Sequence, residues 1–132
     1  MDITINLVAL SVNNLQESIN WYTKILGFTL VDEYQNAEMQ IARIQLGSAI
    51  FELIQVKTNQ QPLPDYRKVL ISDLQVTGTK HVCLQVQNLD TILPLLQANK
   101  IELVGQPDTT YYGGKYIFFK DCNGILIELY QA

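Results

Sequence analysis

The chain has 132 residues, of which 48% are hydrophobic and 17% are charged, a composition typical of a folded domain rather than a disordered segment. Its net charge of −4 argues against nucleic acid or an anionic membrane as a partner, because phosphate groups would repel it. The sequence has neither a bilayer-length apolar run nor a signal peptide, so we expect a cytoplasmic protein. Cys83 and Cys122 are too few for a disulfide framework and are expected to be free thiols.

The first part of the chain predicts one helix among four strands. Apolar residues recur at helical spacing from Leu15 to Leu26, after a capping signal at Asn14 and before a natural stop at Gly27. The strands predicted around this helix cover residues 5–12, 28–34, 40–46 and 49–56.

A polar, proline-containing connector follows over residues of about 58–78. Residues 69–74 within it predict a short helix or turn. A connector of this length inside a compact domain is typical of a functional loop or lid. We therefore expect a single domain, with one module at about 1–57, this connector, and a second module at about 79–132.

The second module repeats the order of the first. A helix is predicted from a cap at Asn88 or Asp90 to about Asn99, with Pro94 near its first turn. Asn123 and Gly124 predict a hairpin turn, and residues 109–114 form a glycine-rich loop. The predicted strands cover residues 81–86, 101–104 and onward, 116–119 and 125–130. The fold class is α+β: two tandem βαβββ modules forming a curved eight-stranded mixed sheet around a cavity.

The two modules also resemble each other residue by residue. Residues 7–15 align with 81–89, and residues 50–55 align with 126–131. This repeat gives Glu52 and Glu128 equivalent positions near the ends of the two modules. His81, the only histidine, stands where the first module has Leu7.

These repeated positions carry the candidate chemistry. The period of two in a strand places Glu52 and Glu128 opposite the helix-facing side of otherwise apolar strands. Such a carboxylate is costly to bury unless it is paired, solvated or bound to a cation. Taken singly, each glutamate could be explained by solvent exposure at the edge of the sheet or by a salt bridge with a lysine or an arginine. Two carboxylates and the imidazole of His81 are together the ligand types that divalent metals accept, so we expect a metal or substrate site at these three residues.

The sequence resembles the vicinal oxygen chelate superfamily, which includes glyoxalase I, bleomycin resistance proteins, extradiol dioxygenases and methylmalonyl-CoA epimerase. The resemblance covers nearly the whole chain. The segments that carry it are residues 7–18, 21–28, 51–54, 78–86 and 118–129. It implies a glyoxalase-like fold and, as is usual in this family, a homodimer.

The resemblance also implies four metal-ligand positions, which hold Leu7, Glu52, His81 and Glu128 in this chain. Three of them keep a ligand, and Leu7 departs from the pattern. The implied function is lyase, isomerase or oxygenase chemistry on a small substrate with vicinal oxygens. Ni, Zn, Mn, Fe or Mg would assist it, and Glu128 or Glu52 would be the catalytic base.

The expected substrate pocket draws on both modules. It is lined by Leu7, Cys83, Tyr111, Tyr112 and Arg43. Arg43, Arg67 and Lys115 are candidate contacts for a substrate carboxylate. The alternative function is a metal-free protein that binds or sequesters a small ligand, as the bleomycin-resistance branch does.

Overall fold

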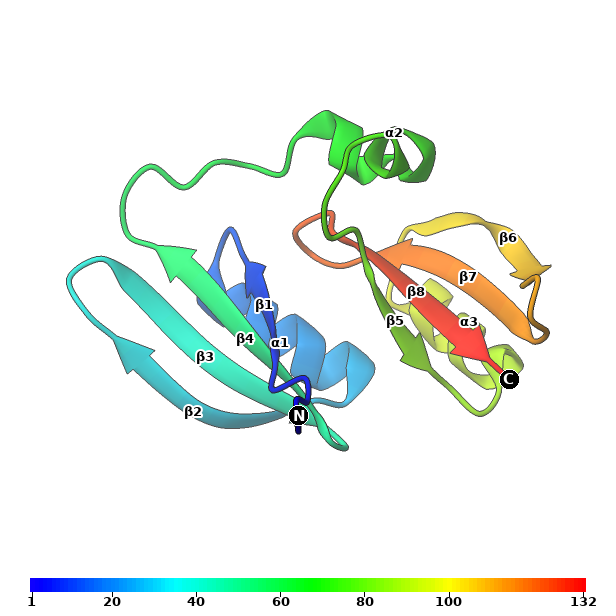
Figure 1. The fold of residues 1–132 in the computed structure, drawn as a ribbon, viewed down its shortest axis with the longest axis horizontal. Coiled ribbons are helices and arrows are strands. Elements are labelled where there is room, and N and C mark those ends of the chain that lie inside the picture. The colour runs from blue at the N-terminus through cyan, green and yellow to red at the C-terminus, as the bar shows by residue number, and fades with distance from the viewer. The chain divides into compact units, whose positions relative to one another are not determined.

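The computed structural model describes residues 1–132, which divide into two compact units, Met1–Pro62 and Leu63–Ala132. Each unit contains one four-stranded mixed sheet with a helix packed on it (Figure 1). The α+β class and the two βαβββ modules are therefore confirmed, with the eight strands hydrogen-bonded in two sets of four. The residues of the predicted connector after Pro62 belong to the second unit. That the two units make one domain stays a prediction.

The first unit follows the predicted order. Its elements are β1 (Val8–Ser11), α1 (Leu15–Leu26), β2 (Thr29–Gln35), β3 (Met39–Leu46) and β4 (Ala49–Val56). The sheet order is β1-β4-β3-β2, with β1 parallel to β4 and the other pairs antiparallel. The side chain of Asn14 caps α1 by accepting from the Glu17 amide at 2.9 Å. Gly27 ends the helix in the left-handed conformation, at φ 77°.

Three aromatic rings form the centre of the first unit's core. Tyr22 from α1 lies 5.5 Å from Phe28 and 5.9 Å from Phe51, measured between ring centroids. Phe28 and Phe51 are 4.9 Å apart, and all three side chains are buried. Since Phe51 faces the helix, its neighbour Glu52 lies on the opposite face of the sheet.

The second unit adds a short helical segment before its module. Its elements are η1 (Asp65–Lys68), α2 (Leu70–Leu74), β5 (Val82–Gln85), α3 (Leu89–Ala98), β6 (Leu103–Thr109), β7 (Lys115–Lys120) and β8 (Leu126–Gln131). The sheet order is β5-β8-β7-β6, with β5 parallel to β8. The predicted turn at Asn123–Gly124 joins β7 to β8, and Gly124 adopts φ 85° there.

Two local details of the second unit differ from the prediction. Pro94 lies in the second turn of α3 rather than the first, where its missing N–H costs the helix one bond to the carbonyl of Asp90. Strand β6 starts at Leu103 rather than at Ile101, and its pairing with β7 is irregular between Val104 and Asp108. A strand edge with a bulge carries a weak sequence signal, because the alternation is interrupted.

Hydrogen bonds reproduce the internal repeat. The side chain of Gln55 accepts from the amide of Leu15 at the start of α1, and Gln131 accepts from Leu89 at the start of α3, each at 2.7 Å. These repeat-equivalent glutamines each tie the last strand of a module to the first amide of its helix. They satisfy a backbone donor that the helix itself leaves unpaired.

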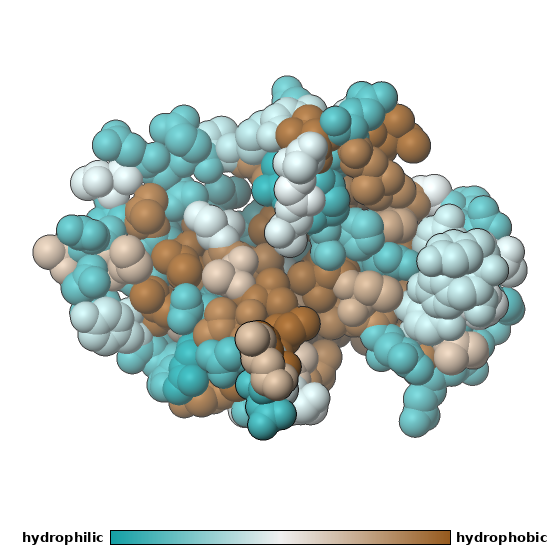
Figure 2. Space-filling model, viewed as in Figure 1, coloured by the Kyte–Doolittle hydropathy of each residue, from teal (hydrophilic) through white to brown (hydrophobic).

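The segment formed by η1 and α2 turns its apolar side chains outward. The large exposed residues of this segment and of the turn that follows it have exposed fractions from 43% to 67% and are Tyr66, Val69, Ile71, Leu74 and Val76. Figure 2 shows hydrophobic surface where Figure 1 labels α2. The fully buried side chain of α2 is instead that of Asp73, at 1% exposure. None of the helices has the length and apolar character needed to cross a bilayer.

Candidate functional site

The strand register gathers the predicted residues of the second unit on the sheet face away from α3. Glu128 on β8 lies directly between Cys83 on β5 and Phe118 on β7 in the sheet pairing. His81 immediately precedes β5 and, two residues before Cys83, lies toward the same face. One module thus supplies a carboxylate, an imidazole and a thiol to a single surface.

His81 and Glu128 are in direct contact. The Nε2 atom of His81 lies 3.1 Å from an Oε atom of Glu128, and the two side chains are 21% and 14% exposed. The His81 ring also packs edge-on against Phe118, with centroids 4.7 Å apart. Two ligands bound to one ion at about 2.1 Å each, at tetrahedral or octahedral angles, would lie roughly 3.0–3.4 Å apart. The observed separation therefore suits two ligands of one divalent ion.

The second ring nitrogen of His81 has an unusual environment. Nδ1 is buried and has no hydrogen-bond partner. Leaving a buried polar atom unpaired costs about 1–3 kcal/mol, so such atoms need an explanation, which is often a functional one. The imidazole is held by Glu128 and Phe118 rather than by a bond to Nδ1.

Glu128 influences the two neighbouring acids of the second unit. Cys83 is exposed as a whole residue, yet partial burial of its thiol, the negative charge of Glu128 and a hydrogen bond to that carboxylate raise the pKa of Cys83 to about 11. The thiol therefore stays protonated at neutral pH and is a weak nucleophile. Partial desolvation, followed by the charge of Glu128, also raises the pKa of Tyr112. Both predicted pocket residues thus lie within the electrostatic reach of Glu128.

The glycine-rich loop between β6 and β7 is attached to β8 through Tyr130. The Tyr130 hydroxyl donates to the Gly113 carbonyl at 3.0 Å, and its ring lies 5.5 Å from that of Tyr112. Gly114, at φ 87°, leaves space for this contact, since a Cβ there would clash with the Gln131 carbonyl oxygen and the Tyr130 ring. Tyr111, at the loop tip, is fully exposed.

We expect Gly114→Ala to destabilise the second unit by about 2–5 kcal/mol. The positive φ costs about 1–2 kcal/mol and the clash with backbone about 1–3 kcal/mol. Gly113→Ala is the matched control, because Gly113 has φ 96° but a methyl group added there would meet nothing within 4 Å. Urea unfolding of the two variants measures the difference. Equal losses would show that the loop does not pack against β8.

The first unit places Glu52 beside a charged pair. Arg43 is the cross-strand partner of both Glu52 and Asp32. Its guanidinium binds Asp32 through two contacts, Nε to Oδ1 at 2.9 Å and Nη2 to Oδ2 at 2.5 Å. The hydrogen bond to Asp32 raises the pKa of Arg43, and the same bond lowers the pKa of Asp32. Arg43 is therefore engaged by a carboxylate of its own chain.

A hollow of about 400 Å³ lies over this pair in the first unit. Its lining residues are Asp32, Glu33, Tyr34, Ile41, Arg43 and Glu52. The sequence predicts Glu52 and Arg43 at a site but does not predict Asp32. Asp32 shares their face only because the β2–β3 register shifts between Leu30 and Asp32. No residue type in that segment signals the shift.

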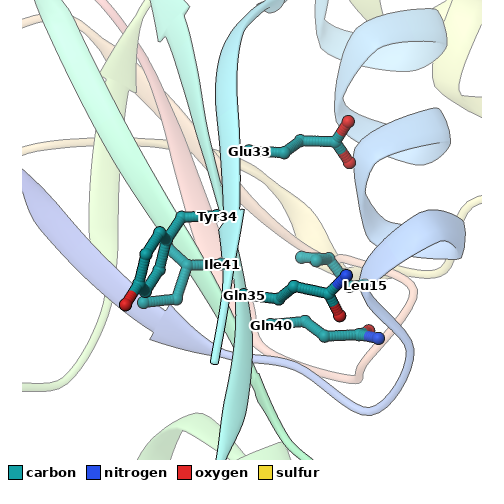
Figure 3. Close-up of a pocket in the computed structure, with 6 residues that line it drawn as sticks. All are labelled: Leu15, Glu33, Tyr34, Gln35, Gln40 and Ile41. Atoms are coloured by element: carbon teal, nitrogen blue, oxygen red, sulfur yellow. The ribbon is translucent and has the colours of Figure 1, made fainter. Parts of the chain in front are cut away.

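A second hollow, of about 270 Å³, lies at the edge strand β2 near the start of α1 (Figure 3). Glu33, Gln35 and Gln40 point from the sheet toward α1, whereas Tyr34 and Ile41 project to the other side. This hollow contains none of the predicted site residues.

The predicted residues are thus distributed over both units. The second unit brings together His81, Cys83, Glu128 and Tyr112, and the first unit holds Glu52, Arg43 and, just before β1, the half-buried Leu7. No group of three or more His, Cys, Asp or Glu side chains that could hold a metal ion is found within either unit. The pair that the structure does form is His81 with Glu128.

Comparison with known proteins identifies the family of the chain. Residues 4–129 match the sequence profile of the Glyoxalase/Bleomycin resistance protein/Dioxygenase superfamily. The chain belongs to this superfamily. The match spans both repeats, so the family resemblance seen in the sequence is confirmed.

Individual superfamily members support the assignment. Human mitochondrial methylmalonyl-CoA epimerase is 26% identical over 97% of this chain and 73% of its own length. The solved glyoxalase family protein from Enterococcus faecalis superposes with a TM-score of 0.80, at 24% identity, over 97% of each chain. A glyoxalase/bleomycin resistance protein/dioxygenase domain from Frankia sp. gives a TM-score of 0.81 at 20% identity, over 100% of this chain and 99% of the other. These two structures confirm the glyoxalase-like fold.

Proposed function

We propose that the protein is a metal-dependent enzyme that moves a proton next to a carbonyl group of a small substrate. The observation that carries the proposal is the 3.1 Å contact of His81 Nε2 with Glu128, a separation that suits two ligands of one ion. Glu52, at the repeat-equivalent position, would supply a third ligand. Superfamily membership supports enzymatic chemistry of this kind.

The residues have distinct roles in this proposal. In this proposal His81 and the two glutamates would hold the ion, which when bound would polarise a substrate carbonyl and stabilise negative charge on its oxygen. Glu128 or Glu52 accepts the proton from the carbon beside the carbonyl and returns it. The raised pKa of Cys83 keeps its thiol protonated, so it donates a hydrogen bond to Glu128 instead of competing as a nucleophile. Tyr112 and Tyr130 provide an aromatic wall next to this carboxylate.

The epimerase relatives favour an isomerase among the reactions open to this superfamily. Methylmalonyl-CoA epimerase, by its name, inverts a carbon centre of an acyl thioester, a reaction that needs proton removal and return with no redox partner. Such a substrate carries a thioester carbonyl and a carboxylate, which are oxygen groups of the kind that a bound divalent ion would accept. We infer a substrate of this class for the present chain.

Proton exchange with solvent tests the proposal. The protein, loaded in turn with Mn²⁺, Ni²⁺, Zn²⁺ or Mg²⁺, is incubated in D₂O with methylmalonyl-CoA and with simpler acyl thioesters and α-hydroxy carbonyl compounds. We expect one or more of them to lose their acidic C–H signal in the proton NMR spectrum, and a chelator to stop this loss. Exchange that is unaffected by both the added metal and the chelator would contradict the proposal.

A metal-free binding protein is the second candidate, and a specific observation favours it. Leu7 takes the place of one ligand, and in the first unit Arg43 and Asp32 neutralise each other beside Glu52. A site with an apolar side chain in one metal-ligand position would suit a small molecule that binds through shape complementarity and hydrogen bonds. Stoichiometric binding of a small ligand by protein without metal would favour this candidate.

We expect Leu7→His to raise the affinity for Ni²⁺ at least about tenfold. Residues that only hydrogen-bond to a metal ligand already change metal affinity by about 10–100-fold, and an added ligand should do at least as much. The added imidazole occupies the position equivalent to His81 in the repeat. Ile5→His is the matched control, since Ile5 is 89% exposed in the segment before β1. Titration calorimetry measures both variants. Equal affinities for both variants and wild type would show that residue 7 is not next to the metal.

A further inference from the structure

Asp73 is the buried charge that neither the fold nor the proposed chemistry explains. Its side chain is 1% exposed, although α2 presents its apolar residues to solvent. A buried carboxylate is costly unless it is paired and hydrogen-bonded. Two cations supply the pairing: Lys80 Nζ lies 3.3 Å and Arg67 Nε 3.4 Å from the same Oδ1 atom.

The contacts of this cluster converge on residue 80. Lys80 Nζ donates to the backbone carbonyl of Asp73 at 2.6 Å, in addition to its contact with the carboxylate. Arg67 Nη2 donates to the backbone carbonyl of Lys80 at 3.3 Å. Lys80 is thus held at both its side chain and its main chain. We call Arg67, Asp73 and Lys80 the charged clamp.

The clamped carbonyl is part of the peptide group that also contains the His81 amide. The pairing of β5 with β8 begins only at Val82 with Ile127, so the sheet does not fix the backbone on the N-terminal side of His81. The peptide group is planar, and fixing the Lys80 carbonyl therefore restricts the direction in which His81 leaves the chain.

The first module offers a natural comparison. Leu7 also lies immediately before its strand, β1, but residues 1–6 ahead of it are exposed and have no regular secondary structure. The apolar contacts of a leucine are not directional, so its backbone needs less exact positioning than that of a residue whose imidazole must point at a partner. The clamp is present in the module whose corresponding position carries an imidazole.

We propose that Asp73 and Arg67 are positioning residues that aim His81 at Glu128 by clamping the Lys80 peptide group. The catalytic purpose of this positioning rests on the proposed function, but the ring contact between His81 and Phe118 that reports on it does not depend on a metal or a substrate. The η1–α2 segment would then support the site, and this is the role we assign to the predicted connector of about residues 58–78.

NMR of His81 tests the clamp without any substrate or metal. His81 is the only histidine, so its imidazole signals are assigned directly. Wild type should show a strong nuclear Overhauser effect between the His81 and Phe118 rings, whose centroids are 4.7 Å apart. We expect Asp73→Asn to weaken this effect at least about twofold and to shift the ring signals, while the far-ultraviolet circular dichroism stays that of wild type.

Two further variants make the test specific. Arg67→Lys keeps the positive charge but lacks the planar fork that reaches both Asp73 and the Lys80 carbonyl, so it should reproduce the weakening. It also decides the question if Asp73→Asn fails to fold, because the Arg67 side chain is 35% exposed. Asp65→Asn is the control: its pair with Lys68, at 3.4 Å, lies on the surface of the same segment, and we expect no change.

Nickel affinity separates this inference from the proposed function. In wild type that binds Ni²⁺, Asp73→Asn and Arg67→Lys should weaken the binding about 10–100-fold, as loss of a support for a metal ligand does. If wild type binds no Ni²⁺ while both variants lose the ring contact, the proposed function fails and the clamp stands. If the folded variants keep the wild-type ring contact, the clamp is overturned whatever the metal affinity.

Discussion

Glu128→Gln should abolish most metal binding and activity while leaving the fold intact. The substitution keeps the shape of the side chain but removes the charge that binds the ion and accepts the proton. We expect Ni²⁺ affinity to fall at least about 100-fold, because losing a residue that only supports a metal ligand already lowers affinity by up to about 100-fold. Proton exchange should fall by about 10²–10⁴, the usual contribution of a general base. The melting temperature should stay the same or rise, because a half-buried negative charge is removed.

The control for this change is Glu102→Gln in the same unit. Glu102 is 69% exposed and its ion pair with Lys120, at 3.1 Å, lies on the surface. The same loss of charge there should change stability by no more than about 0.5 kcal/mol and leave Ni²⁺ affinity unchanged. Calorimetric titration and thermal unfolding of the two variants supply the comparison. A Glu128→Gln protein with wild-type affinity would remove Glu128 from the proposed site.

Phe51→Ala should cost the largest amount of stability in the first unit, about 3–5 kcal/mol. Phe51 is 1% exposed and packs against the rings of Phe28 and Tyr22. Its removal leaves a cavity between α1 and β4 that the rigid sheet cannot close. Guanidinium unfolding monitored by circular dichroism measures the loss.

Tyr34→Ala is the matched aromatic truncation. Tyr34 lies on the edge strand β2 and is 61% exposed, so its loss should cost no more than about 1 kcal/mol. A cost for Phe51→Ala as small as that for Tyr34→Ala would mean that the three-ring cluster is not the core of this unit.

The fold was largely predictable because its signals are local and repeated. Asn14 and Gly27 bound α1, and Gly124 marks the turn before β8, each through the conformation of a single residue. The repeat then assigned the same order of elements to both modules. Pro94 and the start of β6 were misplaced, because tertiary packing decides how far a helix runs past a proline and where a bulged strand begins pairing.

The site was predictable only in part. Strand periodicity predicts that Glu128 lies on the sheet face away from the helix, and the repeat adds His81 as a candidate at the start of the module. The structure brings the two side chains into contact. The sequence could not reveal that Arg43 is bound by Asp32, since that pairing depends on a register shift, nor that Asp73 is buried. An aspartate such as Asp73 in an apolar stretch, followed by a lysine such as Lys80, does not by itself predict a buried charged cluster. The three-dimensional packing is needed to see it. The metal, the homodimer and the cellular location stay predictions.

Metal content is the most direct test of the central claim that His81 and Glu128 are ligands of one ion. The protein is purified without a chelator or a histidine tag from cells supplied with Ni²⁺, Zn²⁺, Mn²⁺ and Fe²⁺. Elemental analysis of wild type and of His81→Gln is then compared. We expect about one divalent ion per wild-type chain and almost none in the variant. Wild-type protein that carries no metal under these conditions, or a variant that keeps as much metal as wild type, would contradict it.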